Sequence, residues 1–496
     1  MLLIFNSNVV SAVNTENTYV VETANVIMGS APYISFDGGR TKISSTEDTL
    51  WMSYKMGNKT FRYTPANNPS SPQNPILLPE SFKTFADIDS VVPKNQSIPD
   101  WAELHEQEIQ FNSRDNREYF FDDDGDKIKS GAGELTLIIA DNGDHLVDED
   151  WWISEPQFGY KRSDPIDPCR YSYRLILKSS ISSVTTELGI PSESSGVPEN
   201  VWKQDRWSFE KLFIVHVKPT VSNPYVCWAF PIYQDPRADH IGKEWKSGTI
   251  DIDDPNDIYL YRGRKRGFLL QNINQPSSNF PTIAGDSLQF TLTVAGILHN
   301  ELSYSKQPAN SNINLTINGV GEYDDITYYG RFPNEAIITL LGPKEGQSDT
   351  SFTPTTFIIY ADKAKTKPIY SFTISQWIIK SNYNQPTFKE SSAYCERIGY
   401  RLPTIPELTN MKNPKLDWNQ GYPPSREEYV AQAQLKGGFY PEWGSRELWR
   451  LPWGSNTEVW VSNHHKNDNY YLVDSYGRIS SKPMTAKAGR TFCISP

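Results

Sequence analysis

The alternation of apolar and polar residues along this chain is mostly that of β-strands. Residues 287–294 and 313–317 alternate with a period of two, and an Asn-Gly pair typical of a tight turn follows the second run. Apolar runs typical of strands also lie at 19–21 and 135–140, and Asp, Asn, Gly and Pro clusters separate such runs. We therefore expect a mainly β structure up to about residue 380.

Changes in composition divide the chain into segments. Its 496 residues are too many for a single hydrophobic core. A polar, acidic stretch at 236–257 marks a boundary between an expected N-terminal β-rich domain, residues 14–235, and a second all-β domain, residues 236–380. The short strands and turns of the second domain predict an immunoglobulin-like β-sandwich. Residues 1–13 end in the small-residue spacing of a signal-peptide cleavage site, and we expect them to be a truncated signal segment.

Residues 381–496, which we call the cap, show helical signals first and strands afterwards. A capping box that begins at Thr387 opens a short helix, and Gly399 is placed to end it. Similar boxes follow twice. Apolar runs at 459–461 and 470–473 then predict strands. We expect an α+β unit here, in contrast to the all-β segments before it.

The four cysteines form two pairs that are local in sequence, Cys169 with Cys227 and Cys395 with Cys493. An even, sparse set without a CxxC motif favours disulfides in an oxidising compartment over a zinc site. Each bridge would close a long loop and stabilise the fold by roughly 4 kcal/mol in the chain-entropy model. Four buried thiols are the alternative. The second pair would close the cap between its first and last elements.

Charge and composition exclude two classes of function. The net charge is −11 and the sequence shows no concentrated basic face, so nucleic-acid binding is not expected. No apolar stretch is long enough to span a bilayer as a helix. Aromatic residues make up 13% of the chain, with 14 Trp and 27 Tyr, and such richness often marks recognition surfaces. Packing within β-sheets is the other explanation for any single aromatic residue.

Calcium is the one cofactor that the sequence suggests. Asp122, Asp124 and Asp126 lie in one acidic turn and could supply oxygen ligands, although their spacing does not fit an EF-hand loop. A solvated acidic turn is the alternative. A metal site at His464 and Asp468 is not expected, because adjacent histidines on a strand point to opposite faces. No other cofactor is indicated.

Motifs that would indicate catalysis are sparse. Residues 285–288 match the nucleophile block of one esterase family, but here they open a strand in an all-β segment, where a turn explains them. Glu442 and Glu447 could be paired carboxylates of a glycan hydrolase. No Ser/His/Asp, Cys/His or phosphate-binding pattern stands out. We therefore expect a protein without catalytic activity.

Several blocks distributed in order along the chain resemble known proteins. They are residues 31–42 (APYISFDGGRTK), 62–65 (RYTP), 85–88 (FADI), the acidic run 122–126, both cysteine pairs, Gln376-Trp377, Tyr394-Cys395, 399–403 (GYRLP), 442–444 (EWG) and 459–462 (VWVS). Together these blocks resemble a family of enterobacterial adhesin domains, formally of unknown function, found at the C-terminal ends of intimin/invasin-like surface proteins. They cover nearly the whole chain and are more specific together than any single motif.

The resemblance implies an extracellular adhesive tip, secreted or associated with the outer membrane of a Gram-negative bacterium. It also implies that the cap is similar to the C-type-lectin-like module of intimin and invasin. The chain departs from sugar-binding lectins, because it lacks a Glu-Pro-Asn or Gln-Pro-Asp block and residues 467–469 match their calcium-ligating strand only in part. The full-length proteins carry a further N-terminal membrane part, so we expect a secreted passenger, a fragment of a split gene, or a misplaced start.

We expect the cap to bind a host-cell surface protein or glycan through polar and aromatic loops, while the β domains hold it rigidly. Such cell adhesion would serve virulence. The residues expected to contact the receptor are Trp443, Trp449, Trp453, His464, Asn467, Asp468 and Tyr470. Trp460 lies between two valines and is expected to be buried. A secreted glycan hydrolase and a structural module that associates with its own copies are the alternatives.

Overall fold

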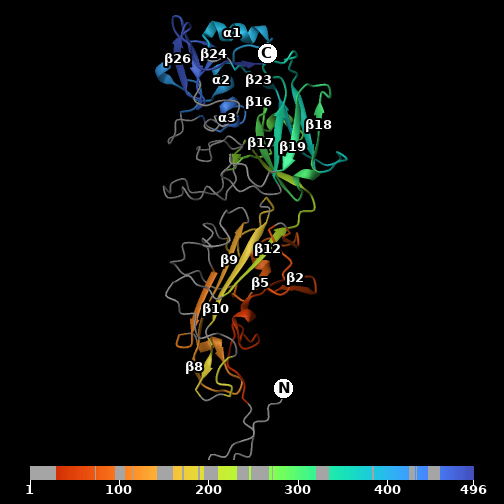
Figure 1. The fold of residues 1–496 in the computed structure, drawn as a ribbon, viewed down its shortest axis with the longest axis vertical. Helices are drawn as coiled ribbons and strands as arrows, with labels where there is room; N and C mark the ends of the chain where they lie inside the picture. The colour runs from red at the N-terminus through yellow and green to blue at the C-terminus, as the bar shows by residue number, and fades with distance from the viewer. Residues whose placement is uncertain are drawn as a thin grey trace, which may run out of the picture.

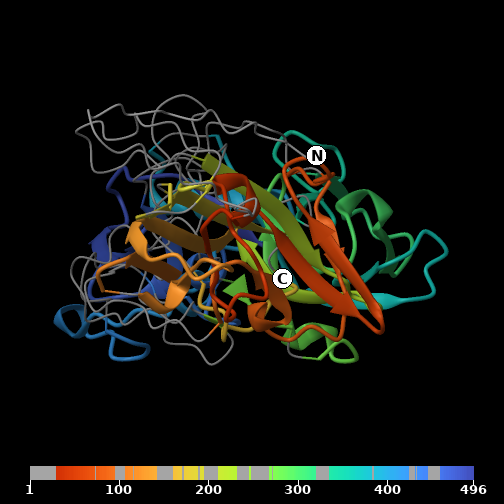
Figure 2. The ribbon, with the colours of Figure 1, turned by 90° about the horizontal axis from the view of Figure 1, so that it is seen from below.

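The computed structural model is mainly β and contains several packed units, as the sequence predicts (Figure 1). The N-terminal sheets lie at one end of the elongated molecule and the cap lies at the other. Seen along the long axis, these units overlap (Figure 2). The structure describes residues 29–94, 107–141, 160–194, 211–231, 245–246, 267–319, 335–423, 431–444 and 458–496, without positions 73, 116, 170–171, 182, 188–189, 271, 383–384 and 432.

A five-stranded sheet forms the centre of the N-terminal part. In spatial order its strands are β4 (Ile76–Leu78), β12 (Lys211–Pro219), β10 (Tyr173–Ile181), β9 (Ala132–Asp141) and β6 (Gln107–Asn112). The pairs are antiparallel except β4 with β12, which is parallel. Tyr173, Leu175 and Leu177 alternate along β10 into one hydrophobic core. This period of two follows from the pleat, which sends successive side chains to opposite faces.

Shorter strands surround this sheet. A three-stranded antiparallel sheet has the order β3 (Lys59–Tyr63), β2 (Met52–Met56) and β5 (Ile88–Ser90). Two small pairs join β1 (Tyr33–Ile34) to β7 (Phe120–Phe121) and β8 (Ile128–Ser130) to β11 (Thr185–Thr186). The 3-10 turns η1 (Thr46–Thr49), η2 (Phe85–Asp87) and η3 (Arg117–Tyr119) connect these strands.

The middle of the chain forms a β-sandwich. One sheet has the order β14 (Trp245–Lys246), β15 (Gly267–Phe268), β13 (Tyr225–Pro231), β17 (Gln289–Ala295), β20 (Glu335–Leu341) and β19 (Asn314–Gly319). The other consists of β18 (Ser303–Gln307), β21 (Thr355–Tyr360) and β22 (Pro368–Ile374), and the short turns η5 (Pro276–Ser278) and η6 (His299–Glu301) lie between strands. The rings of Phe290 and Phe372 meet edge to face at 5.7 Å between centroids, which brings the two sheets together.

The expected boundary between residues 235 and 236 stays a prediction, and the strand pairing bears on it directly. Strand β13 belongs to the segment before this boundary, yet it pairs with β17 of the sandwich. The disulfide between Cys169 and Cys227 links the segment between β9 and β10 to β13. The N-terminal part and the sandwich are therefore joined by a disulfide as well as by the backbone.

The cap begins with helices and continues with a sheet, as predicted. Its elements are α1 (Phe388–Arg397), α2 (Ile405–Leu408), η7 (Pro414–Leu416), α3 (Phe439–Trp443), β24 (Val459–His464), β25 (Asn469–Val473), β26 (Ile479–Pro483) and β27 (Phe492–Ile494). The predicted capping box is present: the Thr387 hydroxyl accepts from the backbone N–H of Glu390, whose carboxylate accepts from the N–H of Thr387. Gly399 follows the helix with a φ of 77°, a left-handed conformation that favours glycine.

In the parts that the structure describes, no helix combines the length and apolar character needed to cross a bilayer.

Candidate functional site

The cap and the sandwich share a sheet. Strand β27, near the end of the chain, pairs antiparallel with β23 (Gln376–Lys380), and β23 pairs in parallel with β16 (Ile283–Gly285). The backbone N–H of Ser495 also donates to the carbonyl of Trp377 at 2.9 Å. One continuous hydrophobic core extends from the sandwich into the cap. These contacts fix the position of the cap on the sandwich.

A disulfide closes the cap between its first helix and its last strand. Cys395 of α1 is bonded to Cys493 of β27, and both side chains are completely buried. With the bridge between Cys169 and Cys227, this confirms the predicted pairing, and the alternative of four free thiols is wrong. Each bridge closes a long loop, so each is expected to contribute about 4 kcal/mol in the chain-entropy model.

Glu442 is buried at the contact between the cap and the sandwich. Its carboxylate accepts hydrogen bonds from the backbone N–H groups of Thr282 (2.7 Å), Ile283 (3.4 Å) and Lys436 (2.8 Å), and from the Thr282 hydroxyl (2.5 Å). The side chain has no exposed surface. Burial raises the pKa of this carboxyl, while the four hydrogen bonds act in the opposite direction. Glu442 is thus unavailable to a substrate in this conformation, and its proposed partner Glu447 lies outside the described residues.

The prediction that Trp443 contacts a receptor is wrong. Its side chain is completely buried, and its indole N–H donates to the carbonyl of Ile283 at 2.7 Å. Its ring also contacts Phe280 and Phe290 of the sandwich. Helix α3 brings Trp443 and Glu442 together against β16, whose edge would otherwise leave backbone groups without partners. Trp443 therefore anchors the cap.

The turn between β24 and β25 presents the other expected contact residues that the structure describes. His464, Asn467 and Asp468 are exposed. The chain reverses with Asn467 in a left-handed conformation, φ 53°, which asparagine tolerates better than most residues. The backbone N–H of His465 donates to the carbonyl of Asn469, and that of Met484 donates to the carbonyl of Asp468. These bonds hold the turn in one shape.

Tyr470 is half-buried, and its ring packs between helix α1 and the His464 side chain of this turn. Its ring stacks on Phe388 of α1 with centroids 3.7 Å apart, and the His464 ring meets its edge at 5.1 Å. Phe388 in turn contacts Trp460, which is completely buried, as predicted. His465 points elsewhere, toward Tyr471 and the Ser481 hydroxyl, in agreement with the expectation that adjacent histidines separate.

Other expected contact residues cannot be placed in this site. Trp449 and Trp453 lie outside the described residues. The sequence interpretation also missed Phe388, although a single phenylalanine directly after the capping threonine of a polar helix was a signal. It missed the ion pair between Lys466 and Asp417, which ties the turn to the segment after η7. Nothing in the local sequence pairs those two residues.

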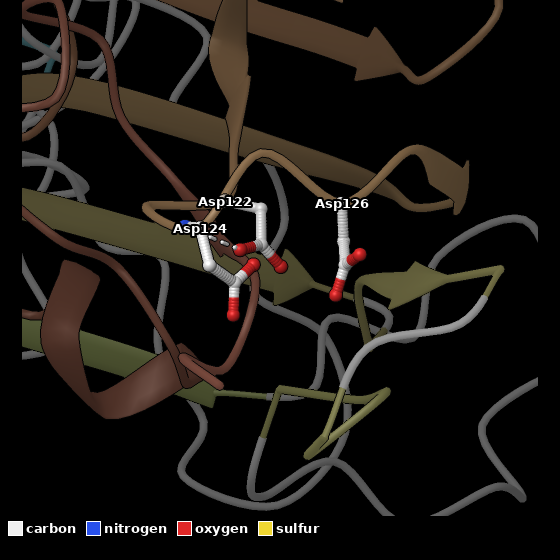
Figure 3. Close-up of side chains that lie close together, drawn as sticks. All are labelled: Asp122, Asp124 and Asp126. Carbon is white, nitrogen blue, oxygen red and sulfur yellow. Dashed lines mark hydrogen bonds between the residues drawn. The ribbon is translucent and has the colours of Figure 1, made fainter. Parts of the chain in front are cut away.

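Asp122, Asp124 and Asp126 lie together on one loop of the N-terminal part (Figure 3). One carboxylate oxygen from each lies within 4.8 Å of the others. Burial, and then the hydrogen bond with Asp124, raises the pKa of Asp122, while the same bond lowers the pKa of Asp124. Asp122 Oδ2 is buried and has no hydrogen-bond partner in the part that the structure describes.

This donor set fits a hard cation. Calcium takes six to eight oxygen ligands, and three carboxylates supply part of such a shell. Asp123 is turned away from the group, because its carboxylate accepts from the Tyr33 hydroxyl and pairs with Lys42. The neighbouring Ser30 donates to both Asp122 and Asp124. The calcium site stays a prediction, and it lies far from the cap in the molecule (Figure 1).

Among solved structures, the chain is similar to fragments of intimin. No protein-family model matches the chain, and no curated protein matches it. A C-terminal 282-residue fragment of intimin, solved in complex with the intimin-binding domain of the translocated intimin receptor Tir, aligns at a TM-score of 0.26 and 9% identity, covering 74% of this chain and 94% of the fragment. Intimin-190 from enteropathogenic E. coli aligns at 0.23 and 13%, covering 43% and 89%.

Proposed function

We propose that this protein is a secreted or surface-displayed bacterial adhesin whose cap binds a receptor on a host cell, without catalysis. The observation that carries the proposal is the exposed turn of His464, Asn467 and Asp468 on a fixed aromatic support. Polar side chains at a turn that stacked, half-buried rings support supply contacts at little cost in ordering entropy. The resemblance of the sequence to adhesin domains points to the same function.

The cap is joined to the rest of the molecule in the way that an adhesive tip requires. A shared sheet and the buried carboxylate of Glu442 connect it to the sandwich, and a disulfide closes the cap itself. We infer that this unit is a C-type-lectin-like module, in which the disulfide joins the first helix to the last strand. Two disulfides favour an oxidising, extracellular location. A host protein and a surface glycan are the two partner classes.

Calcium-dependent sugar binding by the cap has little support. Within the described part of the cap there is no group of three His, Cys, Asp or Glu side chains that could share an ion. A calcium-dependent lectin site needs several oxygen ligands at one place. We therefore favour a protein receptor over a sugar held through calcium.

The glycan hydrolase is the weaker alternative. Hydrolysis of a glycosidic bond needs two carboxyl groups that both reach the substrate. Glu442 is buried with four hydrogen-bond donors around its carboxylate. The role of this residue in joining the cap to the sandwich accounts for its presence.

Binding of the full chain to host cells, measured as a saturable isotherm, tests the proposal. The variant His464→Ala/Asp468→Ala removes two exposed side chains of the turn, and we expect at least about tenfold weaker binding, as for truncations at an interface centre. Lys389→Ala/Glu396→Ala removes two exposed side chains of α1 and is the matched control. Equal thermal midpoints for all three proteins would exclude unfolding as the cause.

Three outcomes would overturn the proposal. Binding that both variants retain would place the site outside the turn. A wild-type chain that binds no host cell but releases sugars from a glycan panel would favour the hydrolase. A mass that rises with concentration in sedimentation experiments, without cell binding, would favour the self-associating module.

A further inference from the structure

The hairpin of β2 and β3 is basic within an acidic protein. From Leu50 to Pro79 the sequence contains no Asp or Glu, and its only charged residues are Lys55, Lys59 and Arg62. All three are exposed, and no acidic side chain that the structure describes forms an ion pair with them. The sequence alone suggested no concentrated basic face, because three charges in thirty residues are not dense. The strand pairing brings them together.

The register of the hairpin places two of these cations on one face. Lys55 lies opposite Thr60, and Ser53 lies opposite Arg62. Opposite residues share a face, so Lys55, Thr60 and Arg62 point to the same side. Lys55 and Arg62 are diagonal neighbours, a relation that separates side-chain origins by about 7–8 Å. We call Trp51, Lys55, Thr60 and Arg62 the basic face.

Trp51 holds the arginine in place. The Arg62 guanidinium lies over the Trp51 ring at 4.2 Å from its centroid. A cation stacked on an indole loses fewer conformations when it meets a ligand, and the planar guanidinium can offer two parallel N–H donors to a carboxylate or sulfate. The basic face therefore presents a positioned donor pair beside a lysine.

One acidic residue shares this side of the sheet. Asp89 of β5 lies opposite Ser53, and it forms an ion pair of 2.5 Å with Lys94. Its charge is thereby balanced, and Lys55 and Arg62 leave the side positive. Strand β3 is also the edge of its sheet, so the face continues to the rim without a further strand in the described residues.

We propose that the basic face binds an acidic polysaccharide, a chain that carries carboxylate or sulfate groups at regular intervals. The extended hairpin carries cations along one side, and their charge is complementary to the repeated anions of an extended polymer. Thr60 lies opposite Lys55 and two residues before Arg62 on the same face, so its hydroxyl can bond a sugar hydroxyl beside the two cations. This site lies in the N-terminal part and is separate from the cap, so it would give the protein a second, independent attachment to a surface.

The hairpin fits a polysaccharide better than a membrane. Its tip exposes one large apolar side chain, Met56, which is 53% exposed. Segments that dock on bilayers bury a whole apolar face in the headgroup region. The third cation, Lys59, lies on the opposite side and stacks over Phe61 at 4.8 Å. Lys55 and Arg62 therefore lie on one side of the hairpin and Lys59 on the other, so the three cations do not all face one flat membrane surface.

Titration of the full chain with heparin, hyaluronan and neutral dextran tests this proposal. We expect binding to the two acidic polymers that weakens with salt, and none to dextran. Lys55→Gln/Arg62→Gln should weaken binding by about tenfold, an effect within the range of two exposed charge pairs. Arg62→Lys should recover part of the affinity. Lys365→Gln/Lys367→Gln removes the same charge from exposed lysines of the sandwich and should leave binding unchanged.

The polysaccharide site would be refuted by equal losses in the two double variants, since charge alone would then explain binding. Absence of wild-type binding to either acidic polymer at low salt would also refute it. So would binding to vesicles that contain phosphatidylserine without binding to the polymers. Retained binding by His464→Ala/Asp468→Ala is expected, and it separates this site from the cap.

Discussion

Glu442 in the cap accepts a hydrogen bond from the backbone N–H of Thr282, 160 positions earlier in the sandwich, at 2.7 Å. The Thr282 hydroxyl donates to the other carboxylate oxygen. A carboxylate without exposed surface is tolerated only when hydrogen bonds compensate for its lost hydration. The contact between these two residues therefore couples the cap to the sandwich, and breaking it should be costly.

We expect Glu442→Gln to lower the free energy of unfolding by about 2–4 kcal/mol, because an amide places N–H groups where the protein offers further donors. Chemical denaturation of the full chain measures this change. Glu396→Gln, at an exposed position of α1, is the control and should have almost no effect. A Glu442→Gln protein as stable as the wild type would show that the contact is dispensable.

We expect the free energy of unfolding to fall in acid, because protonation of Glu407 removes its stabilising contacts. Burial alone would raise the pKa of this carboxyl, but the hydrogen bonds from Arg401 and Thr404 outweigh burial and lower the pKa to about 2. Its folded pKa thus lies below the unfolded value of 4.5. The stabilisation is complete above pH 4.5 and is lost as the pH falls toward 2.

The variant Glu407→Gln isolates this contribution. It should be less stable than the wild type by about 2 kcal/mol at pH 7, and the difference should shrink toward pH 2. Denaturation midpoints at several pH values measure the difference. Glu407 also accepts from Gln376 of the sandwich at 2.8 Å, so the loss should extend to the contact between the units. A difference that stayed constant with pH would contradict the assignment.

Trp443→Phe separates anchoring from receptor contact. The change keeps an aromatic ring but removes the donor to the Ile283 carbonyl, so unfolding should become easier by about 1–3 kcal/mol. Affinity for host cells, corrected for the folded fraction, should stay the same. Trp460→Phe loses a comparable bond to the Pro386 carbonyl and is the matched comparison. A specific loss of affinity in Trp443→Phe would restore Trp443 as a contact residue.

Calcium should stabilise the N-terminal part if Asp122, Asp124 and Asp126 bind it. At a concentration one hundred times its dissociation constant, a ligand adds about 2.7 kcal/mol to the free energy of unfolding. The thermal midpoint should rise with calcium and return with a chelator. Asp124→Asn/Asp126→Asn should abolish the rise, and Asp123→Asn should keep it, because Asp123 turns toward Lys42. A wild-type thermal midpoint that calcium does not change would contradict the calcium site and favour the alternative, a solvated acidic turn.

Local patterns in the sequence predicted local structure well. The capping box at Thr387, the alternation along β17 and the buried Trp460 each depend on neighbours within a few residues. The disulfide pairs followed from spacing. By contrast, the burial of Glu442 depends on Thr282, which no local pattern connects to it.

The same reason explains what was missed at the two candidate surfaces. Trp443 lies in an aromatic-rich segment of the cap, and its contacts with Phe280 and Ile283 of the sandwich, which no local pattern indicates, bury it. The basic face arises because a hairpin folds Arg62 back beside Lys55. The charges of a sequence can be counted directly, but their grouping follows from strand register.

The pairing of β27 with β23 has a consequence for biosynthesis. The chain is synthesised from its N-terminus, so β23 emerges before the cap. Its neighbour β27 is the last strand of the cap and emerges only after the rest of the cap. Until then one edge of β23 lacks its partner strand, beside the apolar side chains of Ile378 and Ile379. Unpaired strand edges favour aggregation. We expect this interval to be when the growing chain depends most on a chaperone.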